Sequence, residues 1–176
     1  SDAALDLDSD GLSNLEEFNA DTDPNVADTD SDGLNDGDEI NVHSTDPKNS
    51  DSDSDGLSDG DEVNVHGTQP NIADSDSDGL SDGDEVSVHL TNPNLIDSDT
   101  DGLGDGYEIT HGYDPTVIED HAILDDDSDT LSNLEEYSLG TNPRSEDSDQ
   151  DELTDPDEVS VYSSNPISAD TDSDGM

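Results

Sequence analysis

The chain has 176 residues, of which 52 are Asp or Glu and only 2 are Lys or Arg, so its formal net charge is -50 at pH 7. With 25% hydrophobic residues, apolar burial cannot offset an ordering entropy of about 1–2 kcal/mol per residue, which excludes a sizeable hydrophobic core. The charge excludes nucleic acid as a partner, the absence of Cys excludes disulfides, and no apolar run reaches the ~20 residues of a membrane span. The chain is therefore either disordered or ordered by something that neutralises its charge.

The acidic residues follow a repeat that begins with a twelve-residue loop, such as DSDSDGLSDGDE from Asp51. Seven full loops begin at residues 6, 28, 51, 74, 97, 125 and 147, and an eighth begins at Asp170 and is incomplete at Met176. We number these loops 1 to 8, and the positions within each loop 1 to 12. Regular spacing of 22 or 23 residues, with one interval of 28, is typical of arrays of stacked units that are too small to fold alone.

A longer period of 119 residues relates the segment from Asp2 to the segment from His121. We therefore expect two parts: residues 1–120 with loops 1 to 5, and residues 121–176 with a second copy of the long unit, comprising loops 6 and 7 and the incomplete loop 8. Because no signal peptide is visible and the second long unit is incomplete, we expect a mature or excised segment of a longer array. The alternative is a head-to-tail fibre, in which another copy completes loop 8.

The loop has the pattern of an EF-hand calcium loop, D-x-[DN]-x-[DN]-G-x5-E. Asp occupies positions 1, 3 and 5, Leu position 7 and Glu position 12 in all seven full loops, and Gly occupies position 6 in five of them. Alternate Asp side chains can converge on one ion, Gly permits the sharp turn, the position-7 carbonyl is a further donor, and a bidentate Glu suits calcium better than magnesium. A solvated acidic linker would explain neither the fixed Gly-Leu pair nor the Glu, so we predict about seven Ca2+ ions.

The predicted metal ligands are the residues at positions 1, 3, 5, 7 and 12, together with Asp at position 9. They are Asp6, Asp8, Asp10, Leu12, Glu17, Asp28, Asp30, Asp32, Leu34, Asp36, Glu39, Asp51, Asp53, Asp55, Leu57, Asp59, Glu62, Asp74, Asp76, Asp78, Leu80, Asp82, Glu85, Asp97, Asp99, Asp101, Leu103, Asp105, Glu108, Asp125, Asp127, Asp129, Leu131, Glu136, Asp147, Asp149, Asp151, Leu153, Asp155, Glu158, Asp170, Asp172 and Asp174.

Loops 2, 3, 4 and 7 carry Asp at both positions 9 and 11, as at Asp59 and Asp61 of loop 3. One ion cannot use all of these carboxylates. Position 9 can coordinate through water or help to hold a second ion, which would allow up to two ions per repeat. The alternative is that these residues only keep the surface soluble.

Histidines recur at 23-residue spacing at His43, His66 and His89. A transition-metal role is conceivable, but Tyr162 takes the equivalent place in repeat 7. We therefore expect these histidines to pack on, or hydrogen-bond to, the neighbouring repeat.

Three or four apolar residues per repeat predict a thin apolar seam between repeats; they include Leu34, Val63, Val65, Ile72, Leu80, Val86 and Val88. Phe18 and Tyr137 directly follow the loop Glu and are expected to be small-core residues. The segment 112–124 is longer than the other connections, and its Ile and Leu residues predict partial order in a kink, bulge or hinge.

The unit DSDSDGLSDGDEV, followed by VHGTQPN, resembles thrombospondin type 3 repeats in the form found in bacterial secreted and surface proteins. The resemblance covers nearly the whole chain. It implies repeats that wrap closely around calcium with little regular secondary structure and serve as extracellular rods or stalks. The chain departs from the animal form, which carries disulfides. It also departs at position 6 of loops 6 and 7, where Thr130 and Glu152 replace Gly and predict weaker binding.

The fold we expect is a calcium-stabilised repeat array, an elongated solenoid-like rod of EF-hand-like loops with short helical turns and little regular secondary structure. The expected function is a non-enzymatic rod, stalk or spacer in a secreted or cell-surface protein, ordered by calcium after export. The alternatives are a calcium-dependent adhesion or interaction module and a fibre subunit. Besides calcium ions, its partners would be neighbouring copies of itself or other surface proteins. Without Cys or a Gly-rich phosphate loop, we expect no enzyme.

Overall fold

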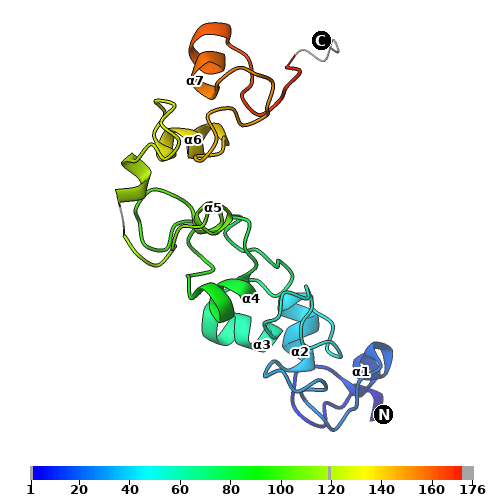
Figure 1. Cartoon of the computed structure of the whole chain (residues 1–176). Coiled ribbons are helices and arrows are strands. Elements are labelled where there is room, and N and C mark those ends of the chain that lie inside the picture. The colour runs from blue at the N-terminus through cyan, green and yellow to red at the C-terminus, as the bar shows by residue number, and fades with distance from the viewer. Residues whose placement is uncertain (1, 119, 172–176) are drawn as a thin grey trace. The chain divides into compact units, whose positions relative to one another are not determined.

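The computed structural model describes residues 2–118 and 120–171 (Figure 1). In this part of the chain the secondary structure consists of short helices, with no strand. The chain divides into two compact units, Ser1–Leu95 and Ile96–Met176. The repeat array with short helical turns therefore agrees with the prediction.

The first unit contains the helices of repeats 1 to 4. They are the 3-10 helix η1 (Asp2–Ala4), the α-helices α1 (Asn14–Ala20), α2 (Asp36–Asp38), α3 (Asp59–Asp61) and α4 (Asp82–Asp84), and the π-helices η2 (Glu39–His43), η3 (Glu62–His66) and η4 (Glu85–His89). Each of the π-helices follows directly on the α-helix before it. The resulting two-turn elements agree with the short helical turns predicted from sequence.

The second unit contains the helices of repeats 5 to 7. They are α5 (Asp105–His111), the 3-10 helix η5 (Asp120–Ile123), α6 (Asn133–Leu139), α7 (Asp155–Asp157) and the π-helix η6 (Glu158–Tyr162). No helix among the described residues is long and apolar enough to cross a membrane.

The choice between α- and π-helix explains the two spacings of the loops. In repeat 6, the left-handed residue that ends the helix is Gly140, four residues after the loop Glu (φ +78°). In repeat 3 it is Gly67, five residues after Glu62, and its N–H donates to the Glu62 carbonyl at 2.7 Å. A π-turn absorbs one residue more than an α-turn, so repeats with the π-turn begin 23 residues apart rather than 22.

Each loop is closed at its base by a backbone hydrogen bond. The N–H at position 9 donates to the carbonyl of the residue that precedes position 1, as from Asp59 to Ser50 at 3.1 Å and from Asp82 to Ala73 at 3.0 Å. This bond brings the start of the helix against the start of the loop. It therefore places positions 9 and 12 beside the Asp residues at positions 1, 3 and 5.

The interior is lined by carboxylates rather than by apolar side chains. The buried hydrophobic residues in the described part of the chain are Leu12, Leu34, Leu103, Tyr113 and Ala122. The largest fully buried side chains, apart from one Leu, are those of Glu, Asn and Asp. The absence of a sizeable hydrophobic core was thus correctly predicted.

The prediction for Phe18 was wrong, and that of an apolar seam was correct only in part, because Leu34 is buried whereas Val65 and Val88 are not. Phe18 is 77% exposed, and Val65 and Val88 of the expected seam are 68% and 62% exposed. Their places are on the outer face of the helical turns, because the inner face carries the position-12 Glu. Tyr137 does pack against a small cluster of Leu103, Tyr113 and Ala122, as predicted.

The described residues of segment 112–124, which do not include residue 119, are ordered, but not by the residues that the sequence suggested. It contains the 3-10 helix η5, and it contributes Tyr113 and Ala122 to the apolar cluster. Ile118 and Ile123 are both 72% exposed. The aromatic ring at the start of the segment therefore holds it in place.

Candidate metal centre

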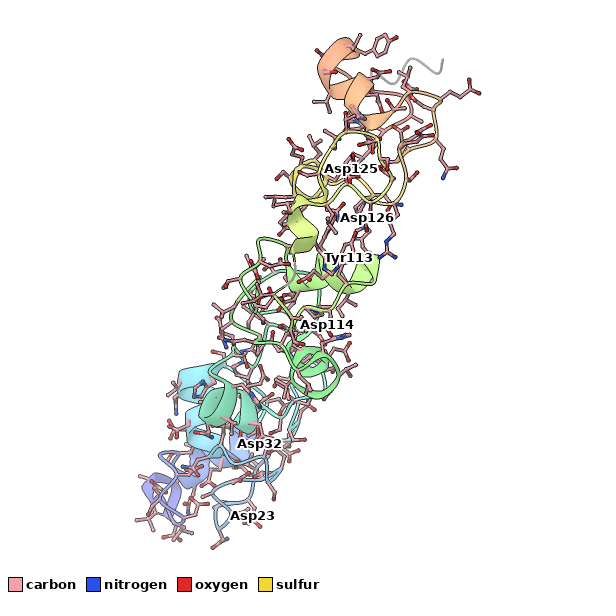
Figure 2. The ribbon with its side chains drawn as sticks, turned by 60° about the vertical axis from the view of Figure 1, so that its left-hand side comes forward. Asp23, Asp32, Tyr113, Asp114, Asp125 and Asp126 are labelled. Atoms are coloured by element: carbon pink, nitrogen blue, oxygen red, sulfur yellow. The ribbon has the colours of Figure 1, made fainter. Side chains whose placement is uncertain are left out.

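The Asp residues at positions 1, 3 and 5 of a loop lie together, as predicted. In loop 3 these are Asp51, Asp53 and Asp55, which each offer a carboxylate oxygen within 4.8 Å of the others. Loops 1 and 2 contain the same arrangement. Figure 2 shows carboxylate side chains of this kind along the ribbon, with Asp32 of loop 2 labelled.

Backbone hydrogen bonds orient these carboxylates and leave one oxygen of the middle Asp without a partner. In loop 3, Asp51 accepts from the N–H groups of Ser54 (2.7 Å) and Gly56 (3.2 Å). Asp55 accepts from the N–H of Leu57 at 2.7 Å. Asp53 accepts from the N–H of Asp55 through Oδ1, while its buried Oδ2 has no protein partner. The loop thus presents a lone buried oxygen at position 3.

Position 6 has a left-handed backbone in every full loop. The five glycines have φ between +101° and +107°, and Thr130 and Glu152 take the same region at +96° and +80°. Loops 6 and 7 therefore follow the same path as the others. Their non-Gly residues bear the cost of a conformation that L-residues resist, about 1–2 kcal/mol.

The Glu residues at position 12 and the Asp residues at position 9 are the most deeply buried acidic residues among those that the structure describes, and the Glu residues have relative exposures of 0 to 1%. Glu62 accepts from the Thr68 hydroxyl at 3.2 Å, but its Oε2 has no protein partner. Both oxygens of Glu17 and both of Glu108 lack protein partners. A buried carboxylate is very costly unless it is paired with a cation or hydrogen-bonded.

The pKa values of the position-12 residues also indicate that their ionised carboxylates need a nearby cation. Burial, reinforced by the Asp residues of the loop, raises the pKa of Glu39, Glu62, Glu108 and Glu136 to about 8, and that of Glu17 to about 7. The two basic residues lie elsewhere: Lys48 pairs with Asp21, and Arg144 with Asp126. Since the donors are all oxygens of acidic residues, the set fits a hard divalent cation such as calcium.

A second acidic group lies where consecutive loops meet. Asp32 and Glu39 of loop 2 and Asp59 of loop 3 offer oxygens within 4.8 Å of one another. The N–H of Gly60 donates to Oδ2 of Asp32 at 2.9 Å. Position 5 of one loop therefore binds the helix start of the next loop and shares an acidic group with it.

Glycine at position 10 makes this approach possible, and the sequence reasoning missed it. A Cβ added to Gly60 would lie 2.1 Å from the carbonyl oxygen of Asp32, and one added to Gly83 would lie 2.2 Å from that of Asp55. Any side chain there would force the two loops apart. The available signal was Gly at position 10 of loops 2 to 5.

Positions 9 and 11 have different environments. Asp59 is completely buried, and it accepts from the N–H and hydroxyl of Ser52 at 2.7 and 2.6 Å. Asp61, by contrast, is exposed, as are its counterparts in loops 2, 4 and 7. A role only in solubility is therefore wrong for position 9 and fits position 11.

The partner of the position-9 Asp was also visible in the sequence. Loops 2, 3, 4, 5 and 7 combine Ser or Thr at position 2 with Asp at position 9. Loops 1 and 6 have neither, and carry Asn14 and Asn133 at position 9. The hydroxyl and the carboxylate thus occur together because they bind each other.

The histidines that recur at 23-residue spacing lie at contacts between neighbouring repeats. The carbonyl of His43 accepts from the Asn71 side chain at 2.8 Å, and that of His66 from Asn94 at 3.1 Å. These positions do connect neighbouring repeats, but through the backbone.

In loop 8, Asp172 and Asp174 lie outside the described residues, so that site stays a prediction.

Comparison with known proteins places part of the chain in a family. The family model of the bacterial TSP3 repeat matches residues 6–27, 28–50, 51–72 and 74–95. No curated protein matches the chain.

Two solved structures are similar to short parts of it. "Biofilm associated protein - B domain" is 44% identical over 26% of this chain and 11% of that chain, with a TM-score of 0.25. "Biofilm associated protein - BSP domain" is 46% identical over 24% of this chain and 7% of that chain, with a TM-score of 0.24. The matched segments thus span about a tenth of those chains or less.

Proposed function

Because the chain belongs to the bacterial TSP3 repeat family, whose members are structural repeats rather than enzymes, we propose that it is a calcium-binding spacer. It would act as an extracellular rod or stalk of a secreted or cell-surface protein. The supporting observation is the buried Glu at position 12 of every full loop. Such an interior requires cations, and oxygen-only donor sets of this kind suit calcium.

In each full loop, one ion would be held by the side chains at positions 1, 3, 5 and 12 and the carbonyl at position 7. Calcium would supply the positive charge that the sequence lacks: seven ions would change the net charge from -50 to -36 (-50 + 14). The 119-residue period would divide the array into the copies 1–120 and 121–176.

The ion requirement also supports an extracellular location. Extracellular calcium modules work at about 10⁻⁴–10⁻³ M calcium. Before export, at low calcium, the chain would stay unfolded because its charges repel one another and it has almost no apolar core. Binding would then couple the folding of the spacer to its arrival outside the cell.

Circular dichroism and small-angle scattering, with calcium and with a chelator, test this function. The chain should lose helix and expand when calcium is removed, and regain both when calcium returns. An unchanged compact profile in chelator would contradict the proposal.

A matched pair of variants tests the loop site itself. Glu62→Gln and Asp61→Asn remove the same charge from neighbouring residues, one buried and one exposed. Calorimetric titration should show the loss of at least one calcium ion in Glu62→Gln and no loss in Asp61→Asn. Equal binding by the two variants would mean that charge density alone attracts the ions.

The number of ions per repeat can be tested at position 9. We propose that Asp59, with Asp32 and Glu39, holds a second ion between loops 2 and 3. Asp59→Asn should remove that ion and keep the loop-3 ion, because Asn133 occupies this position in loop 6 and its Oδ1 accepts from the position-2 N–H at 3.3 Å. If Asp59→Asn bound as many calcium ions as Asp61→Asn, each loop would bind one ion only.

A further inference from the structure

One acidic group in the second unit includes a histidine. Asp101, Glu108 and His121 each offer a ligand atom within 4.8 Å of the others. Glu108 is fully buried, and neither of its carboxylate oxygens has a protein partner; Oδ2 of Asp101 is also without one. Buried carboxylate oxygens without protein partners are costly when ionised, so beside an imidazole they favour the binding of a cation.

The inserted segment brings His121 to this place. Loops 5 and 6 begin 28 residues apart, six more than loops 6 and 7, and the additional residues include the 3-10 helix η5. The ring of His121 stacks on that of Tyr113, with centroids 4.6 Å apart and planes inclined by 27°. Tyr113 is itself fixed by its hydroxyl, which donates to Asp126 at 2.8 Å (Figure 2).

The residue that completes the acidic group between loops 2 and 3 is replaced here. Asp59 contributes a carboxylate to that group, whereas loop 6 has Asn133 at the same position. The Asn133 amide nitrogen faces the protein, donating to the Tyr113 hydroxyl at 3.2 Å and the His121 carbonyl at 3.0 Å. An amide N–H₂ cannot bind a cation, so the imidazole of His121 supplies the third donor.

This exchange alters the metal preference of the site. Three carboxylates form an all-oxygen set that suits calcium, while two carboxylates and an imidazole form a set that suits zinc and related transition metals. We propose that Asp101, Glu108 and His121 bind a divalent transition-metal ion, with Zn2+ as its probe. Asp101 and Glu108, at positions 5 and 12 of loop 5, would both be shared with the calcium ion proposed for that loop.

The test is a Zn2+ titration of the full chain in millimolar calcium, followed by calorimetry. Binding of Co2+ gives a second readout, because its visible absorption depends on the geometry and donor set of the site and should change when His121 is replaced. We expect one zinc equivalent that calcium does not displace. Complete displacement of zinc by millimolar calcium would overturn the proposal, whereas calcium binding by the other loops would still be measured separately in the same samples.

Two substitutions of the histidine assign the site. His121→Phe keeps a ring to stack on Tyr113 but removes the donor, and it should weaken zinc binding at least about a hundredfold, because loss of outer partners alone costs about 10- to 100-fold. His121→Asp should weaken zinc binding and add one calcium ion, since it restores three carboxylates. His66→Ala, in a repeat without the insertion, is the control and should bind zinc like the parent chain. Loss of zinc in the control, or its retention in both His121 variants, would contradict the assignment.

Discussion

The repeats of loops 2 to 4 and the inserted repeat of loops 5 and 6 solve the same packing problem in different ways. In the first region, one loop approaches the next through Gly60 and Gly83, whose N–H groups donate to Asp32 and Asp55. In the second, Leu134 takes the place of that Gly, and a cluster of Leu103, Tyr113 and Ala122 lies between the loops. The regular repeats thus rely on backbone contact, and the inserted one on side chains.

The difference shows what the additional residues contribute, since loops 5 and 6 begin 28 residues apart, five more than loops 2 and 3. Without them, a carboxylate from the next loop closes the acidic group. With them, the connection supplies an aromatic ring, a histidine and a buried amide network around Asn133. The insertion converts a junction made of charges and backbone into one with its own small core.

The largest expected effect is a pH-dependent loss of helix in the metal-free chain, and it arises from the buried Glu residues that both regions share. Their pKa, ordinarily 4.5, is raised to about 8 at Glu62 and Glu108 in the metal-free fold, through burial and neighbouring Asp residues. A raised folded pKa stabilises the metal-free fold below pH 4.5, and this contribution is lost as the pH rises toward 8. Metal-stripped protein should therefore lose helix from pH 4.5 to 8, as followed by circular dichroism.

Calcium should reverse this dependence, because it binds the deprotonated carboxylates. The calcium-loaded chain is expected to keep its helix at pH 8. If the metal-stripped chain shows the same helix content at both pH values, the position-12 residues do not control its order.

The next effect should be specific to the regular repeats. Gly60→Ala forces a methyl group against the Asp32 carbonyl, and we expect it to cost about 3 kcal/mol of unfolding free energy in calcium. Gly67→Ala is the matched control, since its Cβ would meet nothing within 4 Å and only its φ of +74° is strained. The control should cost about 1 kcal/mol. Equal costs, measured by thermal unfolding at fixed calcium, would mean that the contact between loops is dispensable.

A smaller effect is expected at position 6 of the loops. Thr130→Gly and Glu152→Gly should each relieve about 1–2 kcal/mol of backbone strain and so raise calcium affinity about tenfold. Gly56→Ala in a regular loop should lower affinity by a similar factor, because its Cβ would meet nothing within 4 Å and its φ is +103°. Calcium titrations of the three variants check both the expected increase and the expected decrease in affinity. A change of the same sign in all of them would rule out strain as the cause.

The smallest effect tests the network of the inserted repeat. Tyr113→Phe removes the hydroxyl that donates to Asp126 and accepts from Asn133, and should cost about 1 kcal/mol. Tyr162→Phe, at a residue that is 59% exposed, should leave the thermal midpoint in calcium unchanged. If Tyr113→Phe left the thermal midpoint unchanged, the stability of this junction would come from packing of the ring alone.

Much of the candidate site could be predicted from the sequence, because a loop is a local structure. The Asp residues at positions 1, 3 and 5 and the Glu at position 12 lie within twelve residues of one another. The closure of the loop therefore depends on backbone geometry that Gly at position 6 and its spacing already specify. The family and the short helical turns follow from the same residues.

The contacts between repeats could not be predicted in this way, because they join residues that are farther apart than one loop, from 13 positions for Glu108 and His121 to 28 for Asp32 and Gly60. That Gly60 touches the Asp32 carbonyl, that Asp59 is buried while Asp61 is exposed, and that His121 reaches Glu108 depend on how one loop packs on the next. The exposure of Phe18 has the same cause: apolar character predicts burial only where the fold offers an apolar interior. In this chain the interior is occupied by carboxylates, so tertiary packing alone decided which apolar residues face the solvent.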